Sequence, residues 1–290
     1  MKSIFIKVSL LILIFSANVV YAKYVVIGHT KSSDAKATAE VIKQVFERKG
    51  FNVATKSGPA ELMFDMLVDK EIDFLVGGWL STTHKTYWEK NKENLIKIGI
   101  IYEKAGYHLA VPSYISREHV ETISDLLKQN VKDRINNNIA VSKTDAEMLY
   151  QSASTLNKYS LDKDGFLINS LSQTELMEFI TSNSKEEKWF VLGLRRPSYL
   201  TKLTSLRILH DPKSIYVGNA DVHLIANQKS WNYIKKPMQE VLKKIELSVK
   251  SIEELDYAIN VRKMSVHDAA RRWLGSRPYT VEYWLEPDLD

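Results

Sequence analysis

Two short apolar runs constrain the fold most, because each has the composition of a strand covered on both faces. They are Tyr24–Gly28 (YVVIG) and Ile72–Gly78 (IDFLVGG), and together they hold a single charged residue. Between them, apolar residues recur at helical spacing in 35–46, and Gly50 is placed to end that helix. Strand, helix and strand in this order predict right-handed β-α-β units, and therefore an α/β fold with mainly parallel sheets.

The same pattern starts again at Asn138, which indicates a second lobe. Predicted strands and helices alternate there, at 138–142, 144–156, 166–168, 172–180 and 189–193, and a further strand is predicted at 221–226, after lobe two. The length of 290 residues also exceeds the usual size of one compact core. We expect lobe one to comprise residues 23–111 and 218–290, with lobe two between them at 112–217.

The first 22 residues differ from the rest of the chain and have the pattern of a secretory signal peptide. Lys2 and Lys7 precede an uncharged apolar stretch from Val8 to Val20, and Ala22 supplies a small residue for cleavage. About 13 apolar residues are too few to cross a roughly 30 Å hydrocarbon core. We therefore predict cleavage after Ala22 and a mature protein in the periplasm.

The chain contains no cysteine, which excludes disulfides, thiolate metal sites and a lipid anchor on an N-terminal cysteine. A free periplasmic protein is therefore expected rather than a lipoprotein. The net charge falls from +5 to +3 when Lys2 and Lys7 are removed, and so small an excess gives no reason to expect nucleic-acid binding. The histidines, such as His108 and His119, are scattered, so no metal and no other cofactor is predicted.

Polar and aromatic residues follow the predicted strands, at the edge where open α/β sheets bind ligands. These segments are 29–32, 79–84, 112–114, 142–145 and 170–173. Because they come from both lobes, a ligand site built from them would lie in a cleft between the lobes.

The segment Ile72–Lys90 (IDFLVGGWLSTTHKTYWEK) carries a more specific pattern. It resembles the W-x-P-T-T-H-x-x-Y element of the OpuAC type, the substrate-binding proteins of glycine betaine, choline, carnitine and proline betaine ABC importers. Other segments resemble the same family in the required order, namely Lys49–Phe51, Tyr107–Tyr114, Asp211–Lys213 and Ala269–Leu285. The resemblance covers nearly all of the mature chain and is weakest at 120–204.

That resemblance implies a two-lobed periplasmic-binding-protein fold of type II, with the ligand cleft between the lobes. The implied function is capture of a small quaternary-amine or zwitterionic solute and its delivery to an ABC permease, whose ATPase subunit supplies the energy. It implies a monomer that makes only peripheral contact with the membrane complex, without a cofactor and without catalysis. The sequence itself contains no G-x-x-x-x-G-K, G-x-S-x-G or H-E-x-x-H motif.

A quaternary ammonium has no N–H to donate, so proteins hold it against aromatic rings, each contact contributing about 0.5–2 kcal/mol. Trp79, directly after a Gly-Gly strand end, is predicted as one wall, although its position alone fits a core residue equally well. Tyr107 is a second candidate near the crossing between lobes. Thr82 either caps the following helix or donates to a ligand carboxylate, and His84 is expected to cap and pack its own loop.

Lobe two contains a departure from the family pattern. Where relatives carry G-W-x-P-H-W, this chain has Gly193–Tyr199 (GLRRPSY). Arg195 therefore stands at the position of a cage tryptophan, and Ser198 and Tyr199 replace the histidine and the second tryptophan. His29 likewise stands where many members have tryptophan, and all four are candidate ligand-binding residues. An inward Arg195 would repel a bare cation and favour a carboxylate, whereas an outward one would simply face solvent.

The sequence leaves three functional hypotheses open. The first is a solute-binding protein of the glycine betaine, choline and carnitine class. The second keeps the fold but has changed specificity, for a carboxylate or another zwitterion, or acts as a secreted ligand sensor. The third is a secreted hydrolase, whose site would have to lie outside the usual catalytic motifs.

Overall fold

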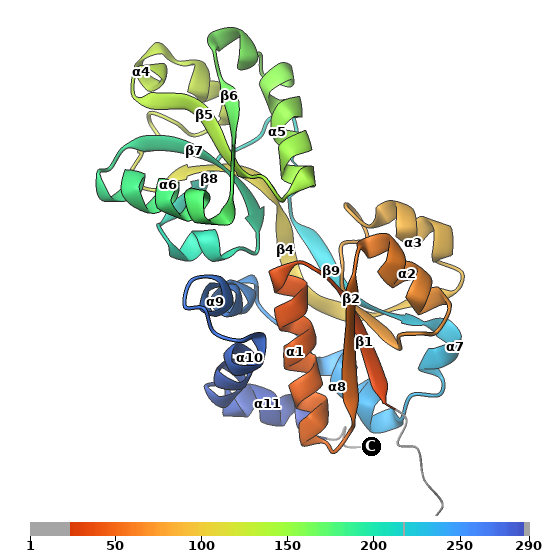
Figure 1. Ribbon diagram of the computed structural model, residues 1–290. Helices are drawn as coiled ribbons and strands as arrows, with labels where there is room; N and C mark the ends of the chain where they lie inside the picture. The colour runs from red at the N-terminus through yellow and green to blue at the C-terminus, as the bar shows by residue number, and fades with distance from the viewer. Residues whose placement is uncertain (1–23, 217, 287–290) are drawn as a thin grey trace, which may run out of the picture.

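The structure is a computed structural model that describes residues 24–216 and 218–286. It has two lobes, the α/β arrangement expected from the sequence, and strand β4 (Leu95–Pro112) runs from one lobe to the other (Figure 1). The predicted signal peptide and its cleavage site after Ala22 lie outside the described residues.

Lobe one is a mixed sheet flanked by helices. Its strands besides β4 are β1 (Val25–Thr30), β2 (Val53–Gly58), β3 (Phe74–Gly78) and β9 (Ala220–Asn227). They follow the order β2-β1-β3-β9-β4, with parallel pairing around β1 and antiparallel pairing on both sides of β9. The helices are α1 (Ser33–Arg48), α2 (Ala60–Val68), α3 (Lys85–Asn91), α7 (Gln228–Trp231), α8 (Lys236–Lys244), α9 (Val249–Asn260), α10 (Val266–Gly275) and α11 (Pro278–Leu285).

Lobe two repeats this plan. Its strands besides β4 are β5 (Ile135–Ser142), β6 (Leu167–Leu171), β7 (Trp189–Arg196) and β8 (Leu206–Ile208). Parallel pairing joins β5 to β6 and β7, while β4 is antiparallel to β7 and β8. The α-helices are α4 (Gln129–Lys132), α5 (Ala146–Lys158) and α6 (Gln173–Lys185), and the 3-10 helices are η1 (Ile123–Leu127), η2 (Asp162–Asp164) and η3 (Tyr199–Lys202). The expected parallel pairing thus holds for three strands of each lobe.

Side-chain caps fix where the two main helices of lobe two begin. The Asp145 carboxylate accepts a hydrogen bond from the Met148 N–H at 3.0 Å and starts α5 directly after β5. Ser172 and Glu175 form a capping box at the start of α6, because each side chain accepts from the other residue's backbone N–H. Both helix starts therefore lie at the carboxyl ends of the parallel strands.

Strand β4 is shared by the two sheets. In lobe one Ala105 is paired with Ala220 of β9, and in lobe two the next residue, Gly106, is paired with Arg196 of β7. The change of partner thus falls between Ala105 and Gly106. The lobe boundaries expected after residues 111 and 217 stay predictions.

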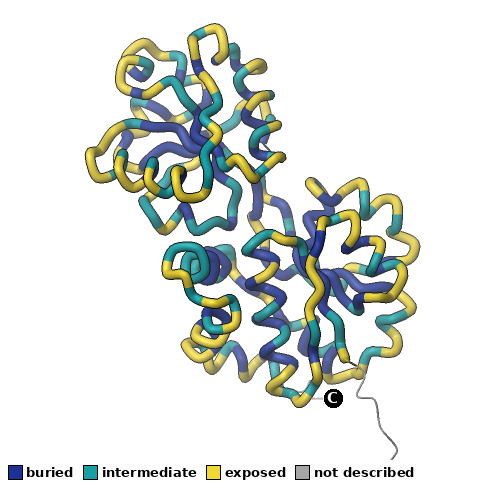
Figure 2. Tube along the Cα trace, in the orientation of Figure 1, coloured by how far each residue is buried: buried dark blue, intermediate teal, exposed yellow. Residues whose placement is uncertain are grey.

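The buried residues form a core within each lobe, and the exposed residues cover the outer helices and loops (Figure 2). Helix α9 has a special place, since it packs against α1 of lobe one and also against η3 of lobe two. The lobes are therefore in contact beside the cleft as well as through β4.

Candidate ligand-binding site between the lobes

A cavity of about 800 Å³ lies between the two lobes. Lobe one lines it with the loops after β1 and β3 and with the start of α2, and lobe two with the loops after β5 and β7 and the starts of α5 and α6. The expected cleft is therefore present, at the carboxyl ends of strands where open α/β sheets bind ligands.

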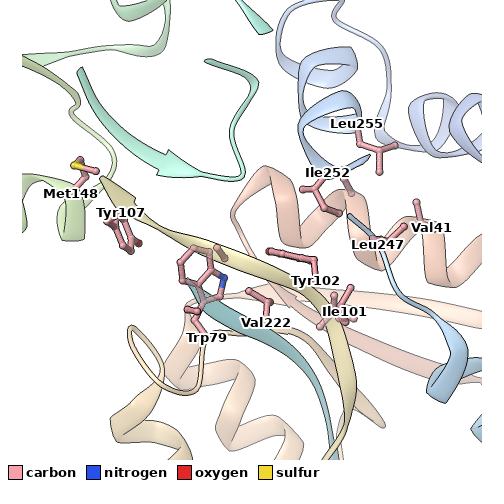
Figure 3. Close-up of a cluster of buried hydrophobic side chains, with 14 of the residues drawn as sticks. Val41, Trp79, Ile101, Tyr102, Tyr107, Met148, Val222, Leu247, Ile252 and Leu255 are labelled. Carbon is pink, nitrogen blue, oxygen red and sulfur yellow. The ribbon is translucent and has the colours of Figure 1, made fainter. Parts of the chain in front are cut away.

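Two aromatic rings form one wall of this cavity. Trp79 directly follows β3, Tyr107 lies on β4, and their ring centroids are 5.7 Å apart. Both side chains are almost fully buried, with 3% and 4% exposed, yet both line the cavity. Figure 3 shows them side by side, with Met148 of α5 beyond Tyr107. Both predicted residues thus line the cavity, and ligand contact by their side chains stays a prediction.

His84 holds the loop that carries Trp79. The Trp79 N–H donates to His84 Nδ1 at 3.1 Å, and the His84 N–H donates to the Trp79 carbonyl at 2.9 Å. Burial, with the charge of Arg195 nearby, lowers the pKa of His84 to about 4. His84 is therefore neutral at neutral pH with its proton on Nε2, which leaves Nδ1 free to accept. The loop-capping role expected for His84 matches this geometry.

Arg195 points inward, into the cavity. Its guanidinium carbon lies 4.8 Å from the centroid of the Trp79 ring. Its two terminal nitrogens donate to the two carboxylate oxygens of Asp34, at 3.0 and 2.9 Å. Because Asp34 belongs to α1 and Arg195 to β7, this bidentate ion pair joins lobe one to lobe two.

Asp34 is a buried carboxylate that the sequence analysis did not single out. It is 1% exposed and also accepts a hydrogen bond from the Tyr102 hydroxyl at 3.0 Å. Burial raises its pKa, but the charge and hydrogen bonds of Arg195 outweigh burial and hold the pKa of Asp34 below its ordinary value. The only sequence signal was an acidic residue in the first turn of a helix that begins at a cleft-facing strand end.

Residues 23–276 match a protein family described as the substrate binding domain of the ABC-type glycine betaine transport system, OpuAC. The chain belongs to this family. The family is one of transport substrate-binding proteins, as the sequence resemblance implied.

Individual relatives of this OpuAC-family protein agree with the assignment. The glycine betaine/carnitine transport binding protein GbuC of Listeria monocytogenes serotype 1/2a (strain 10403S) is 21% identical over 159 residues. That match spans 55% of this chain and 52% of GbuC, so it covers about half the length of the relative.

Solved structures share the fold over nearly the whole chain. Lactococcal OpuAC, in a closed-liganded conformation with glycine betaine, superposes with a TM-score of 0.72 at 23% identity, covering 91% of this chain and 100% of that one. ProX from Borrelia burgdorferi superposes with a TM-score of 0.71 at 24% identity, covering 92% of this chain and 97% of ProX. A choline binding protein in complex with choline superposes with a TM-score of 0.67 at 17% identity, covering 90% of this chain and 91% of that one. The predicted two-lobed binding-protein fold is confirmed.

Ser198 and Tyr199 of this OpuAC-family protein also line the cavity, at the start of η3. The Ser198 hydroxyl oxygen accepts from the Leu200 N–H at 3.3 Å, and the Tyr199 N–H donates to Asp256 of α9 at 2.6 Å. Asp256 is buried, and burial raises its pKa to about 6. The side chains of Ser198 and Tyr199 stay predicted ligand contacts.

Two predicted ligand contacts lie outside the cavity lining. His29 is a buried residue of β1 whose Nδ1 is 2.7 Å from the Thr30 carbonyl oxygen. The Thr82 hydroxyl is buried without a hydrogen-bond partner among the described residues, and the neighbouring Thr83 lines the cavity instead. Ligand contact by His29 and Thr82 stays a prediction that the cavity geometry does not support.

The part of the chain that the structure describes holds no group of three or more His, Cys, Asp or Glu side chains that could bind a metal ion. In the same residues no helix combines the length and the apolar character needed to cross a bilayer.

Proposed function

We propose that this chain is the periplasmic solute-binding component of an ABC importer. It captures a small quaternary-amine or zwitterionic solute between its lobes and delivers it to a membrane permease, while ATP hydrolysis belongs to a partner ATPase subunit. The solute-binding role is favoured by a single arrangement above all, the Trp79 and Tyr107 rings on the wall of a cavity that both lobes line.

The cavity has a suitable size and chemistry for this role. Its volume of about 800 Å³ lies within the range of small-molecule sites, which is roughly 300–1,000 Å³. Trp79, Tyr107 and Tyr199 offer rings, while Thr83, Ser198 and other side chains offer polar groups. A solute that contacts both lobes favours their closed arrangement, because it binds the closed form more tightly than the open one.

The periplasmic location rests on the N-terminal pattern together with the extent of the family match. The match begins at residue 23, directly after the predicted cleavage site at Ala22. In this proposal the chain acts as a monomer. It delivers its solute to the permease, makes only peripheral contact with the membrane complex and catalyses no reaction.

A ligand screen tests the proposal on the mature chain. Thermal unfolding is measured with glycine betaine, proline betaine, choline, carnitine, proline and small carboxylates, and each hit is titrated by calorimetry. A solute at 100 times its dissociation constant should stabilise the protein by about 2.7 kcal/mol. Saturable binding with unchanged solute recovered from the complex is the expected result. Turnover of any solute would contradict the proposed role, and so would the absence of binding by the whole panel.

A further inference from the structure

We propose that Arg195 is a tethered cation that occupies the Trp79 face of the cavity and thereby selects against quaternary ammonium solutes that carry no carboxylate. The inference rests on the proposed function to the extent that the cavity is the solute site. It names Arg195 as the residue that sets the class of solute accepted beside Trp79.

The first argument is geometric. The guanidinium carbon lies 4.8 Å from the Trp79 ring centroid, which is the contact distance of a cation on an aromatic face. A solute ammonium on the same face would have to displace Arg195, since two cations repel each other and one ring face has room for one of them. The face that a quaternary ammonium would use is therefore already filled.

The second argument concerns the counter-charge. Asp34 is buried and binds both terminal nitrogens of Arg195, so the carboxylate behind the Trp79 face is neutralised within the chain. A quaternary ammonium that displaced Arg195 would leave buried Asp34 without these two hydrogen bonds, because it has no N–H to donate, and this loss is costly. Trp79, Asp34 and Arg195 together form a complete cation site whose cation comes from the protein itself.

The third argument concerns which solutes remain acceptable. Asp34 engages one hydrogen on each terminal nitrogen, and the Arg195 side chain keeps 23% of its surface exposed where it lines the cavity. The Tyr107 hydroxyl also interacts with Arg195, but a guanidinium has five N–H donors, so donors remain for a solute carboxylate. A zwitterion with a carboxylate is therefore accepted beside Arg195, whereas choline and tetramethylammonium are disfavoured.

A comparison of two neighbouring arginines tests this inference. Arg196 is the matched control, because its Nε donates to buried Glu253 of α9 at 2.9 Å, again across the lobes, but Arg196 does not line the cavity. Tetramethylammonium and choline are titrated by calorimetry into the wild type, Arg195→Ala and Arg196→Ala. We expect Arg195→Ala to bind both probes about tenfold more tightly than the wild type, and Arg196→Ala to bind them as the wild type does.

Two results would overturn the inference. One is an unchanged probe affinity in folded Arg195→Ala, and the other is an equal gain in Arg196→Ala, which would point to general loosening between the lobes. Folding is checked by circular dichroism. If Arg195→Ala does not fold, the double variant Asp34→Asn/Arg195→Met decides, since it leaves no buried unpaired charge. It should gain about threefold in probe affinity, and no gain would overturn the inference.

The same titrations separate this inference from the proposed function. If the wild type binds no solute of the panel but Arg195→Ala binds tetramethylammonium and choline, the proposed function fails and the role of Arg195 stands. If the wild type binds choline as tightly as Arg195→Ala does, the role of Arg195 fails and the proposed function stands.

Discussion

Arg195 and Arg196 are consecutive residues of β7, yet they bind carboxylates on two different helices of lobe one. Arg195 pairs with Asp34 of α1, and Arg196 pairs with Glu253 of α9. Successive residues of a strand point to opposite faces, so one dipeptide reaches both helices. The end of β7 is thereby fixed to lobe one on two sides, next to the shared strand β4.

Removing Asp34 should destabilise the protein strongly. Asp34→Ala leaves the half-buried Arg195 guanidinium without its carboxylate, and losing hydrogen bonds between charged groups costs about 1.5–3 kcal/mol. Arg271→Ala is the control, because it breaks the exposed Asp268–Arg271 pair and leaves Asp268 in place at the start of α10; this pair is expected to contribute about 0–1 kcal/mol. Urea denaturation of both variants measures the difference. Similar losses in the two variants would show that the Asp34 pair contributes no more than an exposed one.

Trp79→Ala should weaken binding of a carboxylate-bearing solute by about tenfold or more, because it removes an aromatic wall of the cavity and the ring that holds the Arg195 guanidinium. Trp79→Phe keeps a ring at the position and should lose less. Trp88→Ala is the control for loss of a tryptophan, since Trp88 lies on α3 outside the cavity lining. Calorimetry with the best solute of the screen ranks the three variants. Equal affinities of Trp79→Ala and Trp88→Ala would remove Trp79 from the site.

Acidification should weaken the fold through His84. Its pKa is about 4 in the folded protein and near 6.5 when exposed, so between these values unfolding takes up a proton. The His84 contribution to the free energy of unfolding is therefore full above pH 6.5 and is lost as the pH falls toward 4. His84→Asn keeps an acceptor for the Trp79 N–H but does not titrate. Its loss of stability between about pH 7 and about pH 5 should be smaller than in the wild type. A loss of stability in His84→Asn as large as that of the wild type would show that His84 does not cause the effect of acid.

Asp256 should act in the opposite direction. Burial raises its pKa from 3.8 to about 6, so near pH 5 the folded form holds a proton that unfolding releases. Its stabilising effect is full below 3.8 and declines as the pH rises to about 6. Asp256→Asn removes the stability gained when Asp256 takes up its proton. The variant should therefore lose more stability than the wild type on going from about pH 7 to about pH 5. Unfolding curves at several pH values measure the free energy of unfolding of both proteins. The same dependence on pH in the variant and the wild type would contradict the prediction.

Residues that follow a buried strand were the most predictable part of the site. Trp79 comes directly after the Gly-Gly end of β3, so its place on the cleft followed from the strand pattern, whereas Tyr107 was a candidate from the family resemblance. The length of β4 did not follow from the sequence pattern. Gly99, Glu103 and Lys104 interrupt the apolar pattern, so the sequence predicts no strand at 95–106, whereas β4 begins at Leu95.

The orientation of Arg195 could not be obtained from the sequence, because its partner is 161 residues away and in the other lobe. A local pattern contains no information on such a contact. The same holds for Asp34, which resembles an ordinary first-turn acidic residue of α1 until β7 is placed beside it.

Because β4 is the last strand of the lobe-one sheet and continues as an inner strand of the lobe-two sheet, between β7 and β8, neither lobe is a separable module. A cut between Ala105 and Gly106 would divide β4 between two fragments, and it would also leave β9 of lobe one on the fragment that carries lobe two, away from its partner β3. Exchange of lobe two between relatives, in order to move a solute preference from one protein to another, would therefore have to carry the whole of β4 with it.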